Sequence, residues 1–132
     1  MSRTPHFLEP LHESGAGSRG HGLQHERTGR VLADTIELAQ DSRTRTRGLL
    51  GRSSLAEGSV MIIAPCNAIH TLFMRFTIDV IFADRQGRVV KLSRRLRPWR
   101  IAAAPRAFAA LELPEGSIER WGVIKGDRIT VC

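Results

Sequence analysis

The chain has 132 residues, 42% of them hydrophobic, which suits one domain with a hydrophobic core. No run of about 18 apolar residues occurs, and the first residues lack the apolar stretch of a secretory signal. The sequence therefore excludes a membrane-spanning helix and predicts a cytoplasmic protein with no membrane partner. The net charge of +7 comes mostly from 18 arginines, which keeps nucleic acid and other polyanions among the candidate partners.

Residues 1–28 are expected to form a disordered tail, followed by a single β-rich domain over residues 29–132. The tail contains several glycines and few branched aliphatic residues, and its three acidic residues balance three basic ones. Such a segment buries too little apolar surface to offset the entropy of ordering it. Its four histidines are irregularly spaced, so they predict no metal site.

The first half of the expected domain contains two strands joined by a short helix. "GRVLADTIELA" has the β-branched and aliphatic content of a strand, and "SVMIIAP" suits a buried strand that ends at proline. Between them the hydrophobic period changes near residues 42–51. Asp41 or Ser42 is placed to cap a short helix there, and Gly51 to end it.

The second half predicts further short strands separated by turns. A helical turn is expected near residues 117–121, capped by Ser117 and closed by Gly122. The strand candidates are residues 69–75, residues 78–83, "VVKLS" after a hairpin turn at 83–88, "AFAALELP" and "KGDRITV". Six or seven short strands predict a mainly β domain, small and jelly-roll-like, sandwich-like or barrel-like.

The stretch "NAIHTLFMRFTIDVIF", residues 67–82, is apolar and β-prone but carries three polar side chains that could form a site. Alternate residues of a strand share a face, so His70 falls with Leu72, Met74 and the other core candidates as their only polar member. Arg75 and Asp79 fall on the other face, where a bend at Thr77 would bring them together. The candidate ligand-binding residues are His70, Met74, Arg75, Asp79 and, from a loop that would close the site, Trp99.

Each of these residues also has a structural interpretation. His70 is either a half-buried histidine bonded to a backbone carbonyl, the polar anchor of a pocket, or a metal ligand together with Cys66. In an extended strand Cys66 and His70 would lie about 13 Å apart, which disfavours the metal interpretation. Arg75 and Asp79 form either a structural ion pair or an anchor for a carboxylate or phosphate.

No nucleotide-binding, zinc-binding or nucleophile motif occurs, so we expect no cofactor and no metal. The two cysteines, Cys66 and Cys132, are expected to be reduced thiols rather than a disulfide, in keeping with the predicted cytoplasmic location.

A basic run extends from residue 85 to residue 106 without an acidic residue. Trp99 lies within it, following Pro98 and flanked by Arg97 and Arg100, and is placed either to stack on a base or sugar or to cap one end of a barrel. The candidate polyanion-binding residues are Arg88, Lys91, Arg94, Arg95, Arg97 and Arg100.

Four segments together resemble the family catalogued as domain of unknown function 192. They are "RTRGLLGRSSL", "PCNAIHTLFMRFTIDVIFADRQGRVV", "LRPW" and "ALELPEGSIERWGVIKGDRI", and the resemblance runs from about Val31 to Val131. It implies a compact, mainly β domain of jelly-roll or sandwich type, and it implies no activity.

Three functions remain open on the sequence. The first is a non-catalytic module that binds an unknown small ligand or protein partner around His70, Arg75 and Asp79. The second is nucleic-acid binding through residues 85–106, which would weaken steeply with salt. The third is a small enzyme that uses His70 and Asp79 as acid and base.

Overall fold

The computed structural model of the chain describes residues 5–13, 21–39 and 48–132. Most of the helix expected at 42–51 lies outside the described residues. Residues 48–51 form a turn, in which Leu49 is buried and Gly51 has the expected left-handed backbone, with φ 85°. No helix within these described ranges is long and apolar enough to cross a membrane.

The described chain is mainly β, as predicted, with ten short strands and two short helices. In chain order the elements are α1 (Glu9–Glu13), β1 (Leu23–His25), β2 (Val31–Ala33), β3 (Thr35–Ala39), β4 (Ser59–Ile63), β5 (Ala68–His70), β6 (Ile78–Ala83), β7 (Val89–Leu96), β8 (Ile101–Ala103), β9 (Ala109–Pro114), α3 (Ser117–Trp121) and β10 (Ile129–Val131).

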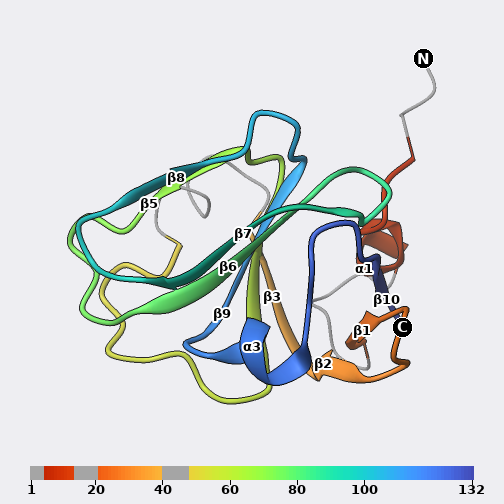
Figure 1. Cartoon of the computed structure of the whole chain (residues 1–132), viewed down its shortest axis with the longest axis horizontal. Helices are drawn as coiled ribbons and strands as arrows, with labels where there is room; N and C mark the ends of the chain where they lie inside the picture. The colour runs from red at the N-terminus through yellow and green to blue at the C-terminus, as the bar shows by residue number, and fades with distance from the viewer. Residues whose placement is uncertain (1–4, 14–20, 40–47) are drawn as a thin grey trace.

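These strands form three sheets rather than a closed barrel. The largest has the order β3-β4-β9-β6-β7, with β3 and β4 parallel and the other neighbours antiparallel. A three-stranded sheet has the order β10-β1-β2, and β5 pairs with β8 alone. Figure 1 shows the β5–β8 pair at the end of the molecule opposite β1, β2 and β10.

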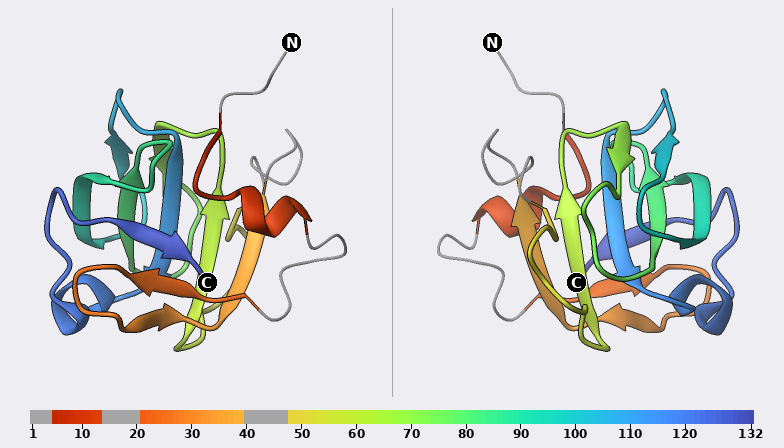
Figure 2. Two further views of the ribbon diagram at one scale, coloured as in Figure 1. Left: turned by 90° about the vertical axis from the view of Figure 1, so that its right-hand side faces the viewer. Right: turned by 90° about the vertical axis from the view of Figure 1, so that its left-hand side faces the viewer.

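The five-stranded sheet is the middle layer of the molecule. One face packs against the three-stranded sheet, α1 and the residues just before α1. From these segments Leu8, Leu11, Leu23 and Ile129 join a cluster with side chains of β4, β6 and β9. Figure 2 shows β10, β1 and β2 running across the strands of this sheet. The other face packs against β5, β8 and Leu49 in a second cluster. Strands β6 and β9 are therefore buried at every position.

Parts of the expected tail belong to this architecture. Residue Leu23 pairs with Val131, and β1 lies between β2 and β10. Leu8 and Leu23 are fully buried. Residues 5–13 and 21–28 thus pack against the domain that was expected to begin at residue 29. Leu8, Leu11 and Leu23, which anchor these segments in the core, are spaced too irregularly to show a period in the sequence.

A buried polar cluster holds this N-terminal part to the chain end. The Nε2 atom of His25 lies 2.7 Å from an Asp127 carboxylate oxygen, and Nδ1 lies 3.0 Å from the Thr28 hydroxyl. Arg27 donates to both oxygens of the same carboxylate. Chiefly through the hydrogen bond from Arg27, the pKa of Asp127 is held well below its usual range.

The predicted strands are recovered with two kinds of difference. Residues 78–83 and their hairpin to β7 are confirmed, but the strand expected over 29–39 divides at Asp34 into β2 and β3 of different sheets. The strand expected at 69–75 ends at His70, and a turn follows it. Strands β1 and β8 were not predicted, because a strand of three residues is too short to show an alternation of apolar and polar side chains.

The short helix α3 is confirmed, but Ser117 does not cap it. The N-cap position is Gly116, and the Ser117 hydroxyl donates instead to the Pro114 carbonyl at 2.6 Å. The predicted end at Gly122 is confirmed by its left-handed backbone, with φ 66°.

The β6–β7 turn supplies the first prediction. A Cβ at Gly87, whose φ is 82°, would overlap the carbonyl oxygen of Ile129, whereas a Cβ at Gly29, φ 73°, would meet nothing within 4 Å. We expect Gly29→Ala to lose about 1–2 kcal/mol of unfolding free energy from the left-handed backbone alone. Gly87→Ala should lose about 1–3 kcal/mol more through overpacking. Denaturant unfolding of both variants checks this, and equal losses would contradict the close approach.

Candidate functional site

The β5–β8 pair places His70 on the molecular surface. Ile69 and Ala102 are Cα partners that both point inward and are buried, whereas His70 and Ile101 are partners on the outer face. His70 is exposed. The expectation that it lies on the core face is therefore wrong. The prediction continued the alternation of β6 back to residue 70. The turn after β5 interrupts that alternation, so the two strands do not share one parity.

The neighbouring residue, Thr71, holds the loop between β7 and β8. Its hydroxyl donates to the Arg97 carbonyl at 2.6 Å and accepts from the Arg100 amide at 2.9 Å. Its own amide donates to the Arg100 carbonyl, and its carbonyl accepts from the Trp99 amide at 2.9 Å. Thr71 is fully buried. One threonine therefore holds three residues of this exposed loop, Arg97, Trp99 and Arg100, by hydrogen bonds.

Two large aromatic rings project from this region into solvent. Phe73 is 69% exposed and Trp99 is 55% exposed, and their ring centroids lie 4.7 Å apart. Both residues have left-handed backbones, with φ near 66° and 65°, a conformation that costs a bulky residue about 1–3 kcal/mol. The neighbouring Ile101 is 73% exposed. We call Phe73, Trp99 and Ile101 the aromatic platform.

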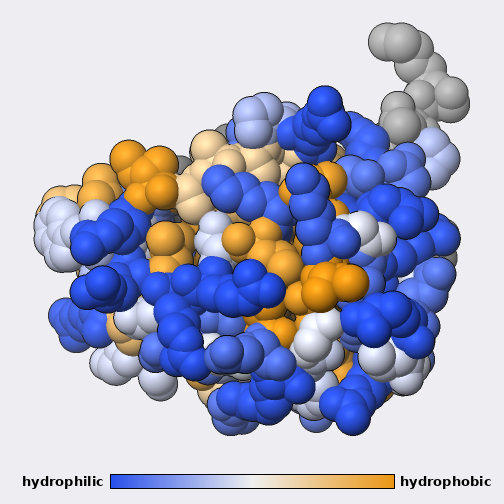
Figure 3. Space-filling view, viewed as in Figure 1, coloured by the Kyte–Doolittle hydropathy of each residue, from blue (hydrophilic) through white to orange (hydrophobic). Residues whose placement is uncertain are grey.

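Basic side chains adjoin the aromatic platform. Arg97 and Arg100 flank Trp99 in the sequence and are exposed, as is His70 opposite Ile101. Arg75, two residues after Phe73, is exposed as well. Figure 3 shows hydrophobic surface over the end of the molecule that carries β5 and β8, next to hydrophilic side chains. The aromatic platform is thus exposed apolar surface with exposed basic residues close to it in the sequence.

Asp79, the third polar residue of the predicted site, lies inside the protein. It is 1% exposed, and its two carboxylate oxygens accept the amides of Arg95 and Ile118, each at 2.9 Å. The first of these bonds fixes the bulge in β7 where Arg95 has φ 48°, and the second satisfies an amide of the first turn of α3. Asp79 is therefore part of the scaffold.

The predicted cluster is not assembled. The described residues show no ion pair between Arg75 and Asp79 and no hydrogen bond between Asp79 and His70. Met74 is buried in the second core cluster. Of the five candidates, His70 and Trp99 lie at the aromatic platform, and Arg75 follows Phe73 on the surface.

The basic run is partly neutralised by neighbouring acids. The guanidinium of Arg95 donates to Glu115 and Glu119 at 3.1 and 3.0 Å, which raises its pKa above the ordinary value. Arg88 and Lys91 donate to the carbonyls of Gly126 and Ala103. Arg94 is exposed, as are Arg97 and Arg100 beside the platform. Three of the six candidates, Arg88, Lys91 and Arg95, are thus hydrogen-bonded to other groups of the chain.

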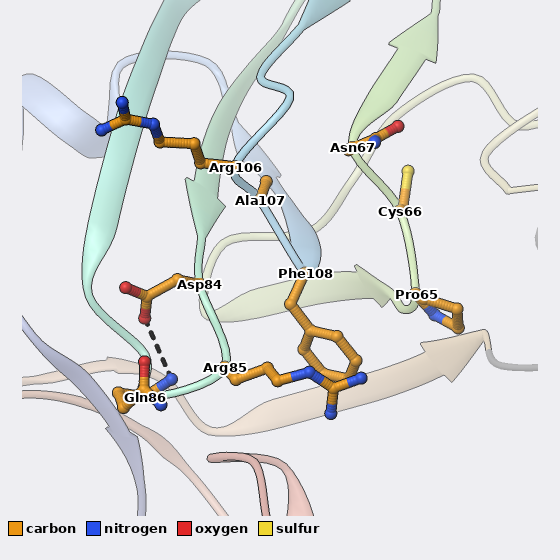
Figure 4. Close-up of a pocket in the computed structure, with 9 residues that line it drawn as sticks. All are labelled: Pro65, Cys66, Asn67, Asp84, Arg85, Gln86, Arg106, Ala107 and Phe108. Carbon is orange, nitrogen blue, oxygen red and sulfur yellow. Dashed lines mark hydrogen bonds between the residues drawn. The ribbon is translucent and has the colours of Figure 1, made fainter. Parts of the chain in front are cut away.

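A cleft of about 540 Å³ lies between the segment after β4 and the turns before β7 and β9 (Figure 4). Its Asp84 carboxylate accepts the amides of Gln86 and Arg88, and the Arg85 guanidinium lies 4.5 Å over the Phe108 ring. Figure 4 shows the Arg106 side chain directed away from Cys66. The polar groups of this cleft do not converge on one point.

The two cysteines are not joined. Cys66 donates its thiol to the Ala68 carbonyl at 3.1 Å, and Cys132 donates to that of Gly22. Within the described ranges, no three His, Cys, Asp or Glu side chains are grouped to hold a metal ion. The structure gives no support to the interpretation of Cys66 and His70 as metal ligands.

One buried carboxyl was missed from the sequence. Glu112, in the middle of β9, is 3% exposed, and its Oε1 has no hydrogen-bond partner among the residues that the structure describes. Burial raises its pKa to about 7, against the opposing charge of Arg52. The signal was available, because "AALELP" holds a single glutamate within an apolar strand. Nothing in the sequence indicated that Phe73 would be exposed.

Comparison with known proteins identifies the family. A family model described as "DUF192: Uncharacterized ACR" matches residues 23–131. The chain belongs to the DUF192 family. A UPF0127 protein of Thermococcus gammatolerans is 35% identical over 111 residues, which cover 80% of this chain and 71% of the relative. The resemblance drawn from the four sequence segments is thereby confirmed.

Two solved structures share the DUF192 fold at 25% sequence identity. A protein of unknown function from Novosphingobium aromaticivorans has a TM-score of 0.71, over 83% of this chain and 81% of its own. A Sinorhizobium meliloti protein described as a "putative transcription regulator" has a TM-score of 0.73, over 84% of this chain and 91% of its own.

The role of Asp79 supplies the second prediction. Asp79→Asn replaces one acceptor oxygen by an amide that faces a backbone N–H, so we expect a loss of about 1–3 kcal/mol in unfolding free energy. His70→Gln and Arg75→Gln, both at exposed side chains, should change stability by less than about 0.5 kcal/mol. Urea unfolding of the three variants checks this. A neutral Asp79→Asn would return that residue to the candidate site.

Glu112 supplies a third prediction, in pH dependence. Because its folded pKa of about 7 lies above the ordinary 4.5, the folded state holds a proton that the unfolded state has lost between those values. Its contribution to stability therefore falls by about 3 kcal/mol as pH rises through this window, and levels off above it. The difference in unfolding free energy between Glu112→Gln and the unaltered protein should grow correspondingly. A difference that is constant with pH would contradict the raised pKa.

Proposed function

We propose that this DUF192 protein is a non-catalytic binding module, and that the aromatic platform is its contact surface. The observation that carries the proposal is the exposure of Phe73 and Trp99 in contact with each other, on left-handed backbones that Thr71 helps to hold. Contiguous exposed apolar surface with a polar border is typical of interaction sites, and Trp is enriched among the residues that dominate binding energy.

The partner that fits best is a protein segment with apolar and acidic side chains. The platform exposes two aromatic rings and one isoleucine. Arg97, Arg100 and Arg75, which lie close to it in the sequence, are exposed as well. An acidic segment would gain charge complementarity at this border, while its apolar side chains cover the rings. The preformed loop geometry lowers the ordering cost of such binding. We place the interaction in the cytoplasm, as the sequence predicts.

Acid–base catalysis by His70 and Asp79 has little support. Asp79 is buried and engaged by two backbone amides, and His70 lies on the outer face of β5. A general base must reach the proton that it abstracts, and the two side chains share no hydrogen bond.

Single-stranded nucleic acid is the second candidate partner. It is favoured by the position of Trp99 between two exposed arginines, since bases stack on aromatic rings beside positive charge. The Sinorhizobium meliloti neighbour described as a "putative transcription regulator" is in keeping with this alternative. The pairing of Arg95 with two glutamates and the carbonyl contacts of Arg88 and Lys91 count against a broad polyanion surface.

The fourth prediction tests the platform directly. In a Trp121→Phe background, Trp99 becomes the only tryptophan, and its fluorescence reports contact. We expect a synthetic peptide of three Asp-Phe-Glu-Leu repeats to change this fluorescence with saturation, and a peptide of Lys-Phe-Lys-Leu repeats to have little effect.

Matched variants separate the platform from other exposed apolar residues. Phe73→Asn removes a ring while tolerating the left-handed backbone, so peptide binding should fall at least about tenfold with stability retained. Ile124→Asn, at an exposed isoleucine elsewhere, should bind as before. Binding that survives Phe73→Asn would contradict the proposal. Binding of an oligothymidine of about 20 nucleotides in preference to the acidic peptide would select the second candidate.

A further inference from the structure

The inference concerns a pair of arginines at the end of the molecule opposite the β5–β8 pair, and it is independent of the aromatic platform. Arg88 directly precedes β7, and Arg128 directly precedes β10. The two residues are partners in an isolated antiparallel bridge, which joins these segments beside the β6–β7 turn (Figure 1). Two residues of like charge therefore lie directly opposite each other, an arrangement that destabilises strand pairing.

The backbone holds the two arginines at the closest spacing of antiparallel pairing. On one side of the bridge the Ile129 amide donates to the Gly87 carbonyl. On the other side the Val89 amide donates to the Asp127 carbonyl, and both bonds are 2.8 Å long. The arginines between these bonds are therefore a non-hydrogen-bonded pair, in which the Cα atoms lie about 4.5 Å apart and the side chains project to the same face.

Each of the two side chains reaches across to the other segment. The Arg88 guanidinium donates to the Gly126 carbonyl at 3.2 Å, and Nε of Arg128 donates to the Gln86 carbonyl at 3.0 Å. A carbonyl is neutral, so these bonds orient the side chains and leave both positive charges in place. Both residues are exposed, and each guanidinium has further N–H groups with which to bind a ligand.

The acidic groups around the pair offset little of its charge. Within the described chain, Arg88 forms no ion pair, and Arg128 has one carboxylate near it, that of Glu26 at 3.7 Å. The Asp84 carboxylate lies in the same turn and accepts two backbone amides there. The Asp127 carboxylate is bonded to Arg27 and His25. The pair therefore remains positively charged.

The composition of the residues outside the described ranges does not supply the missing negative charge. Residues 1–4 and 14–20 each contain one arginine and no acidic residue, and residues 40–47 contain three arginines and one aspartate. These segments together hold five arginines against one aspartate. The sequence thus offers no acidic segment there to pair with the two arginines.

Two arginines on one face of a strand pair match a doubly charged oxyanion. A guanidinium presents a planar fork of donors that binds phosphate oxygens in a bidentate manner. The terminal phosphate of a monoester carries a charge of about −2 at neutral pH and several strong acceptor oxygens. We propose that Arg88 and Arg128 form a binding site for the phosphate group of a phosphate monoester. The bound anion offsets the repulsion between the two like charges.

The experiment titrates the full chain with methyl phosphate at constant ionic strength and records the backbone amide and Nε–H NMR signals of Arg88 and Arg128. We expect saturable shifts at both residues. Dimethyl phosphate, a monoanion like each phosphate of a nucleic-acid backbone, should bind at least about tenfold more weakly. The peptide Gly-phosphoserine-Gly distinguishes the sources of the group: tighter binding than methyl phosphate supports a phosphorylated protein, and weaker binding a small monoester.

Matched variants separate the arginine pair from general positive charge. Arg88→Gln and Arg128→Gln each remove one fork, so the affinity for methyl phosphate should fall at least about tenfold. Arg94→Gln removes the same charge at another exposed position and should bind as before. Arg128→Lys keeps the charge but lacks the planar fork, so it should recover part of the affinity that Arg128→Gln loses.

These variants are expected to fold, because they keep the backbone bonds of the bridge and remove or retain an exposed charge that faces a like charge. Shifts that grow without saturation in the unaltered protein would overturn the proposal. So would unchanged binding in Arg128→Gln, an equal loss in Arg94→Gln, or dimethyl phosphate bound as tightly as methyl phosphate. None of these outcomes bears on peptide binding by the aromatic platform.

Discussion

The carboxylate of Asp79 is the interaction on which the arrangement of the central sheet depends. It lies on β6, the strand between β9 and β7, and accepts one amide from the β7 bulge and one from the start of α3. The Ile118 amide would otherwise lack this partner in a buried setting, where an unsatisfied group costs about 1–3 kcal/mol. The two carboxylate oxygens thus link β6 to β7 and α3. Its place between two backbone amides explains why it takes no part in a surface site.

Thr71 has the equivalent role for the candidate binding surface. Its backbone and hydroxyl form hydrogen bonds to Arg97, Trp99 and Arg100, so the loop that carries the exposed Trp99 ring is held in place. Phe73 and Trp99 keep their strained left-handed backbones because the hydrogen bonds of Thr71 hold the surrounding chain. The same loop orients Ile101 opposite His70 on β8 and β5. Rigid presentation of apolar groups is the property that distinguishes a binding surface from an accidental patch.

The sequence predicted the class of fold and several elements well, because β6, β4 and β9 are apolar runs with clear ends. It identified Trp99 and His70 as candidates but assigned the wrong face to His70. Strand parity holds only within one strand, and a turn separates β5 from β6. It grouped Asp79 with Arg75 because strand parity puts both on one face and a bend at Thr77 would bring them together. Sequence spacing carries no information on the distant amides that donate to Asp79. Glu112 was visible as a polar residue in an apolar strand, but its missing partner is a property of the folded chain alone.

The central claim is that the loop carrying Trp99 is held in place before any partner arrives. Amide hydrogen exchange of Trp99 and Arg100 tests it most directly, because both amides donate to Thr71 while their side chains are exposed. The structure predicts slow exchange at both positions, and selective loss of protection at Arg100 in Thr71→Val, which lacks the hydroxyl. Exchange of both amides at the rate of an open loop in the unaltered protein would contradict a preformed aromatic platform.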